Sequence, residues 1–187
     1  MKSIAVYCGS SLGASEIYKE QAILLGQFLA KNNISLIYGG ASVGIMGTIA
    51  DAILKEGGSV VGVIPAFLEQ REIAHKSLTK LIRVENMHER KAKMMDLADG
   101  FIALPGGPGT LEEFFEVFTW NQIGLLQKPC GILNINGYYN KLIELFDHMV
   151  TEKFLQERSR NVFYVDDNYE SLLKKMYTYE PPAIKTY

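Results

Sequence analysis

The sequence predicts an α/β protein built on one open parallel sheet of about seven strands, with helices on both faces. Short apolar runs rich in β-branched residues alternate along the chain with longer segments of helical period, a pattern typical of βαβ units. Two of these runs lead directly into glycine-rich turns, and open parallel sheets bind ligands at such strand ends. The 187 residues, 48% of them hydrophobic, suit one sizeable core, so we expect a single domain over 1–187 with a tail at 179–187.

The order of the elements follows from the spacing of the apolar residues. The predicted strands span 3–8, 35–38, 60–64, 81–84, 101–104, 131–133 and 162–165. The predicted helices span 16–31, 46–55, 88–97, 111–126, 139–154 and 169–177. The first of these helices carries apolar residues along one face, and Ser15 is placed to cap its N-terminus.

Charge and cysteine usage exclude several classes of protein. The 19 basic and 21 acidic residues leave a net charge of -2, which provides no long-range field to attract nucleic acid or an anionic membrane. Cys8 and Cys130 lie in apolar runs without CxxC spacing, and the N-terminal run reaches glycine before it attains the length of a signal peptide. We therefore expect a cytoplasmic protein with reduced thiols.

The three histidines give no sign of a metal site. His75, His88 and His148 are scattered without the spacing of metal ligands, and no Ser/His/Asp arrangement accompanies them. We expect neither a metal nor a catalytic triad.

A glycine-rich turn after the predicted strand 101–104 is the main candidate binding site. The run Pro105-Gly106-Gly107-Pro108-Gly109-Thr110 removes side chains where the strand passes into a helix, so that backbone N–H groups and the helix N-terminus point at one anion. This arrangement predicts a phosphate cradle, although the glycines could merely permit a tight turn. The run lacks both the G-x-G-x-x-G dinucleotide pattern and the G-K-[ST] ending of a P-loop, which disfavours redox cofactors and nucleoside triphosphates.

An earlier glycine-rich segment, 39–47, follows the predicted strand 35–38. Its Gly44 and Gly47 either let a ribose or base approach the backbone closely or serve helix-to-strand packing. The sequence leaves both interpretations open.

The start of the predicted helix 111–126 is acidic. Thr110, with Glu113 three residues later, matches a capping box, which would be a complete structural explanation of Glu113. The competing hypothesis is catalytic, because a carboxylate beside a bound sugar phosphate can stabilise the oxocarbenium ion that forms when a glycosidic bond breaks. Helical spacing also leaves Glu112, Glu116 and Thr119 beside the apolar face of this helix.

A basic segment opens the predicted helix 88–97. Arg90 and Lys91 lie in its first turns and should share the rim of the sheet with the glycine turn, which makes them candidate anion contacts. A basic run on a helix is more often only a solvated face, but cations near a helix N-terminus oppose its dipole. Glu72 lies in a polar loop and by itself indicates only surface.

Taken together, the segments Gly39-Gly40 to Gly47, Met87-His88-Glu89-Arg90-Lys91 and Pro105 to Glu113 resemble the Lonely Guy (LOG) family. That family comprises cytokinin riboside 5′-monophosphate phosphoribohydrolases and related bacterial nucleotide nucleosidases. The resemblance covers most of the chain, and the P-G-G-x-G-T-x-x-E pattern is its most specific part.

The resemblance implies a Rossmann-like fold, a homodimer, and hydrolysis of AMP or an N6-modified AMP to a free base and ribose 5-phosphate without a cofactor. It implies that Arg90 and Glu113 are the catalytic pair. The substrate contacts that it implies are Glu72, Lys91, Gly106, Gly107, Pro108, Gly109, Thr110, Leu111, Glu112 and Thr119. The base, adenine or N6-prenyladenine, stays open.

Two other functions compete with this one. A non-catalytic nucleotide carrier or sensor would use the same glycine turn but would not need Arg90 and Glu113. A pyridoxal phosphate-dependent lysine decarboxylase is a weaker alternative, because nothing around Lys76 predicts a Schiff-base lysine. Finally, Phe114, Phe118 and Trp120 are compatible either with a dimer interface or with the core.

Overall fold

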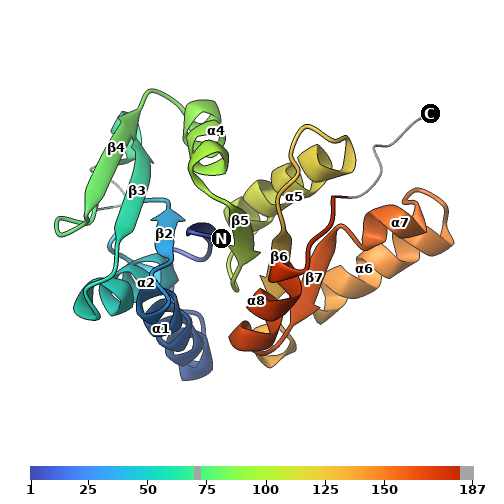
Figure 1. Ribbon diagram of the computed structural model, residues 1–187, viewed down its shortest axis with the longest axis horizontal. Coiled ribbons are helices and arrows are strands. Elements are labelled where there is room, and N and C mark those ends of the chain that lie inside the picture. The colour runs from blue at the N-terminus through green and yellow to red at the C-terminus, as the bar shows by residue number, and fades with distance from the viewer. Residues whose placement is uncertain (70–72, 182–187) are drawn as a thin grey trace.

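The computed structural model describes residues 1–69 and 73–181, so Glu72 and the end of the predicted tail lie outside the described residues (Figure 1). Its strands form one seven-stranded sheet in the order β4-β3-β2-β1-β5-β6-β7, and neighbouring strands run parallel. The strands are β1 (Ser3–Tyr7), β2 (Ser35–Tyr38), β3 (Val60–Pro65), β4 (Lys80–Val84), β5 (Gly100–Ala103), β6 (Cys130–Leu133) and β7 (Phe163–Asp166).

Helices cover both faces of this sheet. One face packs against α1 (Glu16–Lys31), α2 (Gly44–Lys55) and α8 (Tyr169–Tyr177). The other packs against α4 (Met87–Leu97), α5 (Pro108–Gln122) and α6 (Asn140–Thr151). The remaining elements are short: α3 (Ala66–Glu69), α7 (Glu157–Arg160) and the 3-10 helix η1 (Ile135–Gly137).

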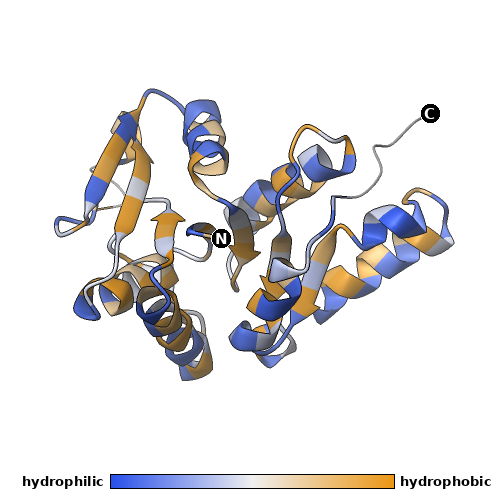
Figure 2. Cartoon of the chain, viewed as in Figure 1, coloured by the Kyte–Doolittle hydropathy of each residue, from blue (hydrophilic) through white to orange (hydrophobic). Residues whose placement is uncertain are grey.

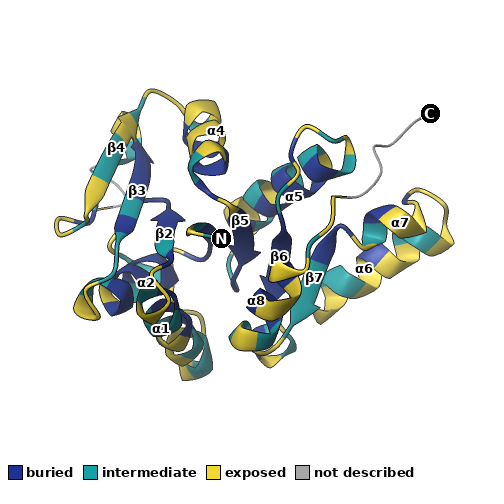
Figure 3. Cartoon of the chain, viewed as in Figure 1, coloured by how far each residue is buried: buried dark blue, intermediate teal, exposed yellow. Residues whose placement is uncertain are grey.

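The central strands are buried on both sides, which explains their continuous apolar sequences. In β1, Ile4 and Val6 join the core on the α1 side, while Ala5 and Tyr7 join the core on the α4 side. The central strands are accordingly largely dark blue in Figure 3, whereas the edge strand β4 and the solvent-facing helix surfaces are partly exposed there and partly polar in Figure 2. Because these strands are apolar on both sides, they are stable only when amphipathic helices cover both faces of the parallel sheet.

The order in which the strands were added to the sheet reverses between the neighbouring strands β1 and β5. From β1 the chain runs outward through β2 and β3 to β4, and from β5 it runs the other way through β6 to β7. The loops that leave β1 and β5 therefore turn toward opposite faces, and a crevice opens between them at this switch point. Directly beyond the strands, the Gly9 N–H donates to the Pro105 carbonyl at 3.1 Å.

The predicted fold class and every predicted strand and long helix are confirmed, with α1 and α8 at their predicted bounds. The helix predicted at 111–126 instead begins at Pro108 and ends at Gln122. Ser15 occupies the N-cap position of α1, but the expected side-chain cap is wrong because its side chain makes no capping hydrogen bond. The short helices α3, η1 and α7 were not predicted.

The aromatic residues of α5 belong to the core. Phe114 and Phe118 are buried, and Phe118 packs edge-to-face on Phe146 of α6 with ring centroids 5.1 Å apart. Phe163 of β7 completes the cluster at 4.8 Å from Phe146, while Trp120 is partly buried against the same core. These contacts decide between the two interpretations of Phe114 and Phe118 in favour of the core.

The first residue of the predicted tail also makes a contact, since the Tyr179 hydroxyl donates to Asn121 Oδ1 at 3.3 Å.

Within the described ranges, no helix combines the length and the apolar character needed to cross a bilayer.

We expect Phe146→Ala to lower the free energy of unfolding by about 3–5 kcal/mol, because it empties the centre of the aromatic cluster. Phe146 is 1% exposed, whereas Phe154, beyond the end of the same helix, is 89% exposed. Phe154→Ala is the matched control and should change stability by less than about 0.5 kcal/mol. Urea unfolding followed by circular dichroism measures both, and equal effects would contradict the packing described.

Candidate functional site

A cavity of about 300 Å³ lies beyond the carboxyl ends of the central strands. The end of β1, the starts of α2 and α5, and helices α3 and α4 contribute to its walls. Its lining residues are Cys8, Gly9, Ser10, Met46, Leu68, Met87, Arg90, Gly107, Pro108, Gly109, Thr110, Glu112 and Glu113. The structure thus brings Arg90 of α4, Glu113 of α5 and most of the glycine turn to one place.

The glycines of the turn have different physical roles. A Cβ on Gly106 would lie 2.2 Å from Thr110 Oγ1 and 2.8 Å from Gly9 N, so close packing requires glycine there. A Cβ on Gly107 or Gly109 would meet no atom within 4 Å, and Gly107 has an ordinary φ of -88°. Neither packing nor backbone conformation demands glycine at these two cavity-lining positions, which fits a turn that a ligand approaches closely.

The capping box predicted at Thr110 is wrong. Helix α5 starts with Pro108 at its first position and Gly107 as N-cap, without a side-chain cap. Thr110 is therefore inside the first turn, where its N–H donates to the Gly107 carbonyl at 3.1 Å. Glu113 lies a turn further along the helix than a capping box requires. The structural explanation that competed with a functional role for Glu113 is removed.

Two tyrosines that the sequence did not single out hold the glycine turn in shape. The Tyr138 hydroxyl donates to the Gly106 carbonyl at 2.6 Å, and the Tyr139 hydroxyl donates to the Leu104 carbonyl at 2.7 Å. Gly106 and Tyr138 also line an adjoining cavity of about 190 Å³. Because these contacts span from η1 to the end of β5, no local sequence pattern could have indicated them.

Arg90 is 5% exposed and reaches across to the loop that follows β2. Its Nη2 donates to the Gly39 carbonyl at 3.1 Å. A Cβ on Gly39 would lie 2.0 Å from that same nitrogen, so the guanidinium fits only against glycine. The start of α4 is set by Asn86, whose side chain accepts from the Glu89 N–H at 2.9 Å.

Lys91 is buried but does not line the cavity. Its ammonium pairs with Glu116 Oε2 at 2.7 Å and with Glu112 Oε1. Burial alone would lower the pKa of Lys91, but the hydrogen bonds to Glu112 and Glu116 outweigh it and raise the pKa above its ordinary value. Lys91 therefore stays charged and offsets two of the three carboxylates on this side of α5.

Glu113 is half-buried and lines the cavity together with Cys8, the residue that follows β1. Burial, and secondarily the charge of Glu113, raise the pKa of the Cys8 thiol well above its ordinary value. Cys8 is consequently a protonated thiol and is not suited to act as a nucleophile.

The remaining predicted positions either lie away from the cavity or fall outside the described residues. Leu111 is partly buried against the core, and Thr119 is exposed with its hydroxyl donating to the Phe115 carbonyl at 2.7 Å, so neither lines the cavity. Glu72 lies outside the described residues.

In the earlier glycine segment, packing is the reason for Gly47, and packing together with a left-handed φ of 60° is the reason for Gly44. A Cβ on Gly44 would lie 2.2 Å from the Ser10 carbonyl carbon, and a Cβ on Gly47 would lie 2.1 Å from the Ser42 carbonyl oxygen.

The cavity also contains residues that sequence reasoning missed: Cys8, Gly9, Ser10, Met46, Leu68 and Met87. The available signal was Gly9-Ser10-Ser11 directly after the first predicted strand, a strand end like the two that were singled out. As for metals, the described ranges contain no group of three or more His, Cys, Asp or Glu side chains placed to hold an ion.

Comparison with known proteins matches nearly the whole chain. The cytokinin riboside 5′-monophosphate phosphoribohydrolase LOG1 of Arabidopsis thaliana is 46% identical over 180 residues, which cover 96% of this chain and 84% of the relative. The cytokinin riboside 5′-monophosphate phosphoribohydrolase of Rhodococcoides fascians is 49% identical over 161 residues, 86% of this chain and 81% of that protein. A family model described as "Possible lysine decarboxylase" matches residues 46–176. The chain belongs to the LOG family.

Solved structures share the fold of this LOG-family chain. TM1055 aligns with a TM-score of 0.70 at 21% identity, covering 95% of this chain and 99% of that one. The molybdenum cofactor binding protein of Rippkaea orientalis aligns with a TM-score of 0.70 at 23% identity, covering 94% and 97%. At these identities the likeness establishes the fold and nothing about ligands.

We expect Lys91→Met to lower the free energy of unfolding by about 1–3 kcal/mol, because it removes a buried ammonium and leaves two carboxylates facing each other. The partly exposed carboxylates hold this cost below that of a fully buried pair. Lys93→Met, at an exposed position of the same helix, is the matched control and should cost less than about 0.5 kcal/mol. Urea unfolding at neutral pH measures both free energies. If the free energy of unfolding of Lys91→Met equalled that of the wild type, the ion pairs of Lys91 would not be stabilising.

Proposed function

We propose that this chain hydrolyses the N-glycosidic bond of a nucleoside 5′-monophosphate, AMP or an N6-modified AMP, to a free base and ribose 5-phosphate. The proposal rests on one observation above all: Arg90 and Glu113 line the same cavity as the glycine turn that begins α5. Its family supports the same reaction, because relatives 46% and 49% identical are named as phosphoribohydrolases of a riboside 5′-monophosphate.

The start of α5 is the proposed seat of the phosphate. Gly107 and Gly109 are exposed to the cavity without side chains, and a helix N-terminus carries positive partial charge and N–H groups suited to an anion. Pro108, Thr110 and Glu112, which line the cavity, would contact this end of the substrate, while Gly106 and Leu111 would shape the turn behind them. Such local binding needs no net positive charge, which suits a chain with a net charge of -2.

A phosphate held there would extend the ribose along the first turns of α5 toward Glu113. As the bond from C1′ to the base nitrogen breaks, its electron pair goes to the base and C1′ becomes cationic. Glu113 would stabilise this cation and orient a water whose oxygen attacks C1′, while one water proton ends on the departing base. Arg90 would neutralise negative charge on the phosphate or on the leaving base.

The carrier and decarboxylase alternatives receive less support. A carrier needs the glycine turn but has no use for a buried guanidinium and a half-buried carboxylate, both costly to desolvate. A decarboxylase that uses pyridoxal phosphate needs a lysine for the Schiff base, and no lysine is among the described residues that line the cavity. Lys76 is exposed and lies outside that lining.

We expect Glu113→Gln to lower kcat for AMP hydrolysis by about 10²–10⁴-fold, because it removes the charge that stabilises the transition state. Arg90→Ala should raise KM if Arg90 holds the phosphate and lower kcat if it assists the leaving base. Asp96→Asn, at an exposed position of α4, is the control and should keep the wild-type rate. The assay follows release of free base and ribose 5-phosphate over a panel of adenine and N6-prenyladenine nucleotides.

Near-normal turnover by a folded Glu113→Gln protein would refute the catalytic assignment. A wild-type protein that binds AMP tightly without releasing adenine would instead favour the carrier. The same nucleotide panel identifies the preferred base.

We further propose that the chain is a cytoplasmic homodimer. Leu125, 70% exposed just beyond α5, and the neighbouring exposed Ile123 offer apolar surface that a second copy would cover. Sedimentation velocity should then give twice the 20.9 kDa chain mass, and a particle of 20.9 kDa would contradict the dimer. The buried free thiols Cys8 and Cys130 suit a reducing compartment, which cell fractionation against a cytosolic marker tests.

A further inference from the structure

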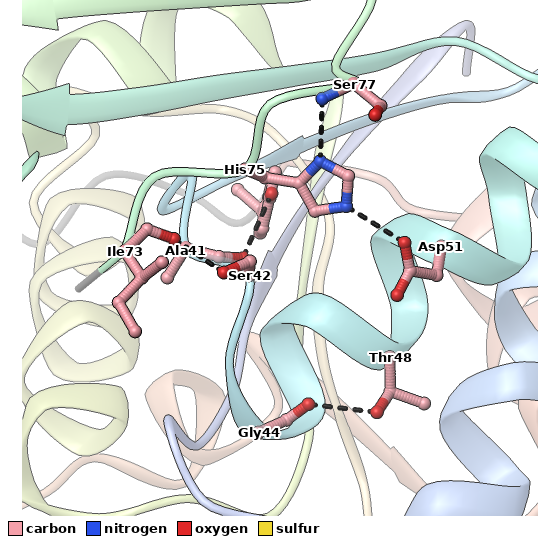
Figure 4. Close-up of polar contacts among 9 residues, drawn as sticks. Ala41, Ser42, Gly44, Thr48, Asp51, Ile73, His75 and Ser77 are labelled. Atoms are coloured by element: carbon pink, nitrogen blue, oxygen red, sulfur yellow. Dashed lines mark hydrogen bonds and ion pairs between the residues drawn. The ribbon is translucent and has the colours of Figure 1, made fainter.

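A buried histidine outside the cavity joins the segment that precedes β4 to the loop that follows β2. His75 is 9% exposed and lies in the stretch 73–77, which runs beside the loop 39–42 (Figure 4). None of the chemistry proposed above uses this histidine, and it does not line the cavity that holds Arg90 and Glu113.

Backbone contacts hold these two segments together. The Ser42 N–H and hydroxyl both donate to the Ile73 carbonyl, at 3.0 and 2.6 Å, and the His75 N–H donates to the Gly40 carbonyl at 2.9 Å. Ala41 and Ala74 form an isolated antiparallel bridge between them. The loop after β2 thus takes its position from a segment that is distant in sequence.

The imidazole of His75 extends this contact to α2. Its Nε2 lies 2.9 Å from Asp51 Oδ1, and its Nδ1 accepts from the Ser77 N–H at 3.2 Å (Figure 4). Because Nδ1 must offer a lone pair to Ser77, the ring proton belongs on Nε2, where it donates to Asp51. Both ring nitrogens are therefore satisfied, and the ring connects the 73–77 segment to a helix.

The segment also contains backbone strain that needs support. Ile73 has a φ of 49°, a left-handed conformation that is costly for a β-branched residue. Such a conformation persists only where the surroundings over-determine it, and the hydrogen bonds of Ser42 and His75 supply that constraint.

The loop held in this way carries the carbonyl that orients Arg90. Gly39, next to Gly40, accepts from Arg90 Nη2 at 3.1 Å. A movement of this loop would therefore change where the guanidinium points. We propose that His75, through its hydrogen bond to Asp51, is a positioning residue that keeps the Gly39 carbonyl in place and so aims Arg90 into the cavity.

This inference rests on the proposed hydrolysis of a nucleoside 5′-monophosphate, and its test uses variants that separate the hydrogen bond from the fold. Asp51→Ala removes the acceptor, and His75→Asn keeps an acceptor for Ser77 but cannot reach Asp51. Asp51→Asn retains an oxygen that accepts from Nε2 and should restore the contact. Lys55→Ala, one turn further along α2 and exposed, is the matched control.

We expect Asp51→Ala and His75→Asn each to lower kcat for AMP by about 5–20-fold with little change in KM, as a small misplacement of a catalytic group does. The double variant should lose no more kcat than either single variant, because both substitutions break the same hydrogen bond between His75 and Asp51. Asp51→Asn and Lys55→Ala should stay within about twofold of wild type. Hydrogen exchange of peptides covering 39–47 and 73–79 should accelerate in the two link-breaking variants alone.

A purely structural role would lower the melting temperature and leave kcat of the folded protein unchanged, which would overturn the proposal. Unchanged exchange at 39–47 in Asp51→Ala would overturn it as well. If wild type hydrolyses AMP and Asp51→Ala matches it, the positioning role alone falls. If wild type releases no base from any nucleotide tested, the proposed function and the positioning role fall together.

Discussion

The pairing of β1 with β5 is the constraint on which the rest of the structure depends. It places two strands from distant parts of the chain side by side at the point where the strand order reverses, so their following loops diverge and leave a crevice. The loops touch there through the Gly9 N–H and the Pro105 carbonyl, and Gly106 must be glycine because a side chain would strike Gly9. Helix α5 starts close to this junction, so the hydrogen bond between Gly9 and Pro105 helps to fix where the helix N-terminus and Glu113 lie.

The electrostatics of the cavity follow from what this packing brings together. An acidic stretch of α5 would repel an anion, but Lys91 of α4 pairs with Glu112 and Glu116. Arg90 instead turns to the loop after β2, where Gly39 leaves room for it. Adjacent basic residues on one helix thus have separate roles, one neutralising carboxylates and the other facing the cavity. Under the proposed function, this division would let a nearly neutral chain offer a local site for a phosphorylated sugar.

Much of this architecture was available from the sequence. The alternation of strand and helix patterns predicted the sheet and its helices, and the run from Pro105 to Glu113 predicted that a glycine turn at a strand end would line a cavity. The capping box failed because Pro108 can start a helix at its first position, which moved the helix start ahead of Thr110. The Asn86 cap of α4 and the hydroxyl contacts of Tyr138 and Tyr139 went unpredicted, the tyrosine contacts because their partners are distant in sequence.

The strands, the long helices, the fold class and the chemical groups at the strand ends could be predicted from local pattern, because apolar period and glycine content are local properties. Which of these groups meet depends on how the helices and loops pack around the whole sheet. Local pattern could not show that Gly107 and Gly109 face open space while Gly39, Gly44 and Gly106 make room for neighbours, or that His75 contacts Asp51. These contacts join segments that are far apart in the chain. They form only when the order of the strands in the sheet brings those segments together.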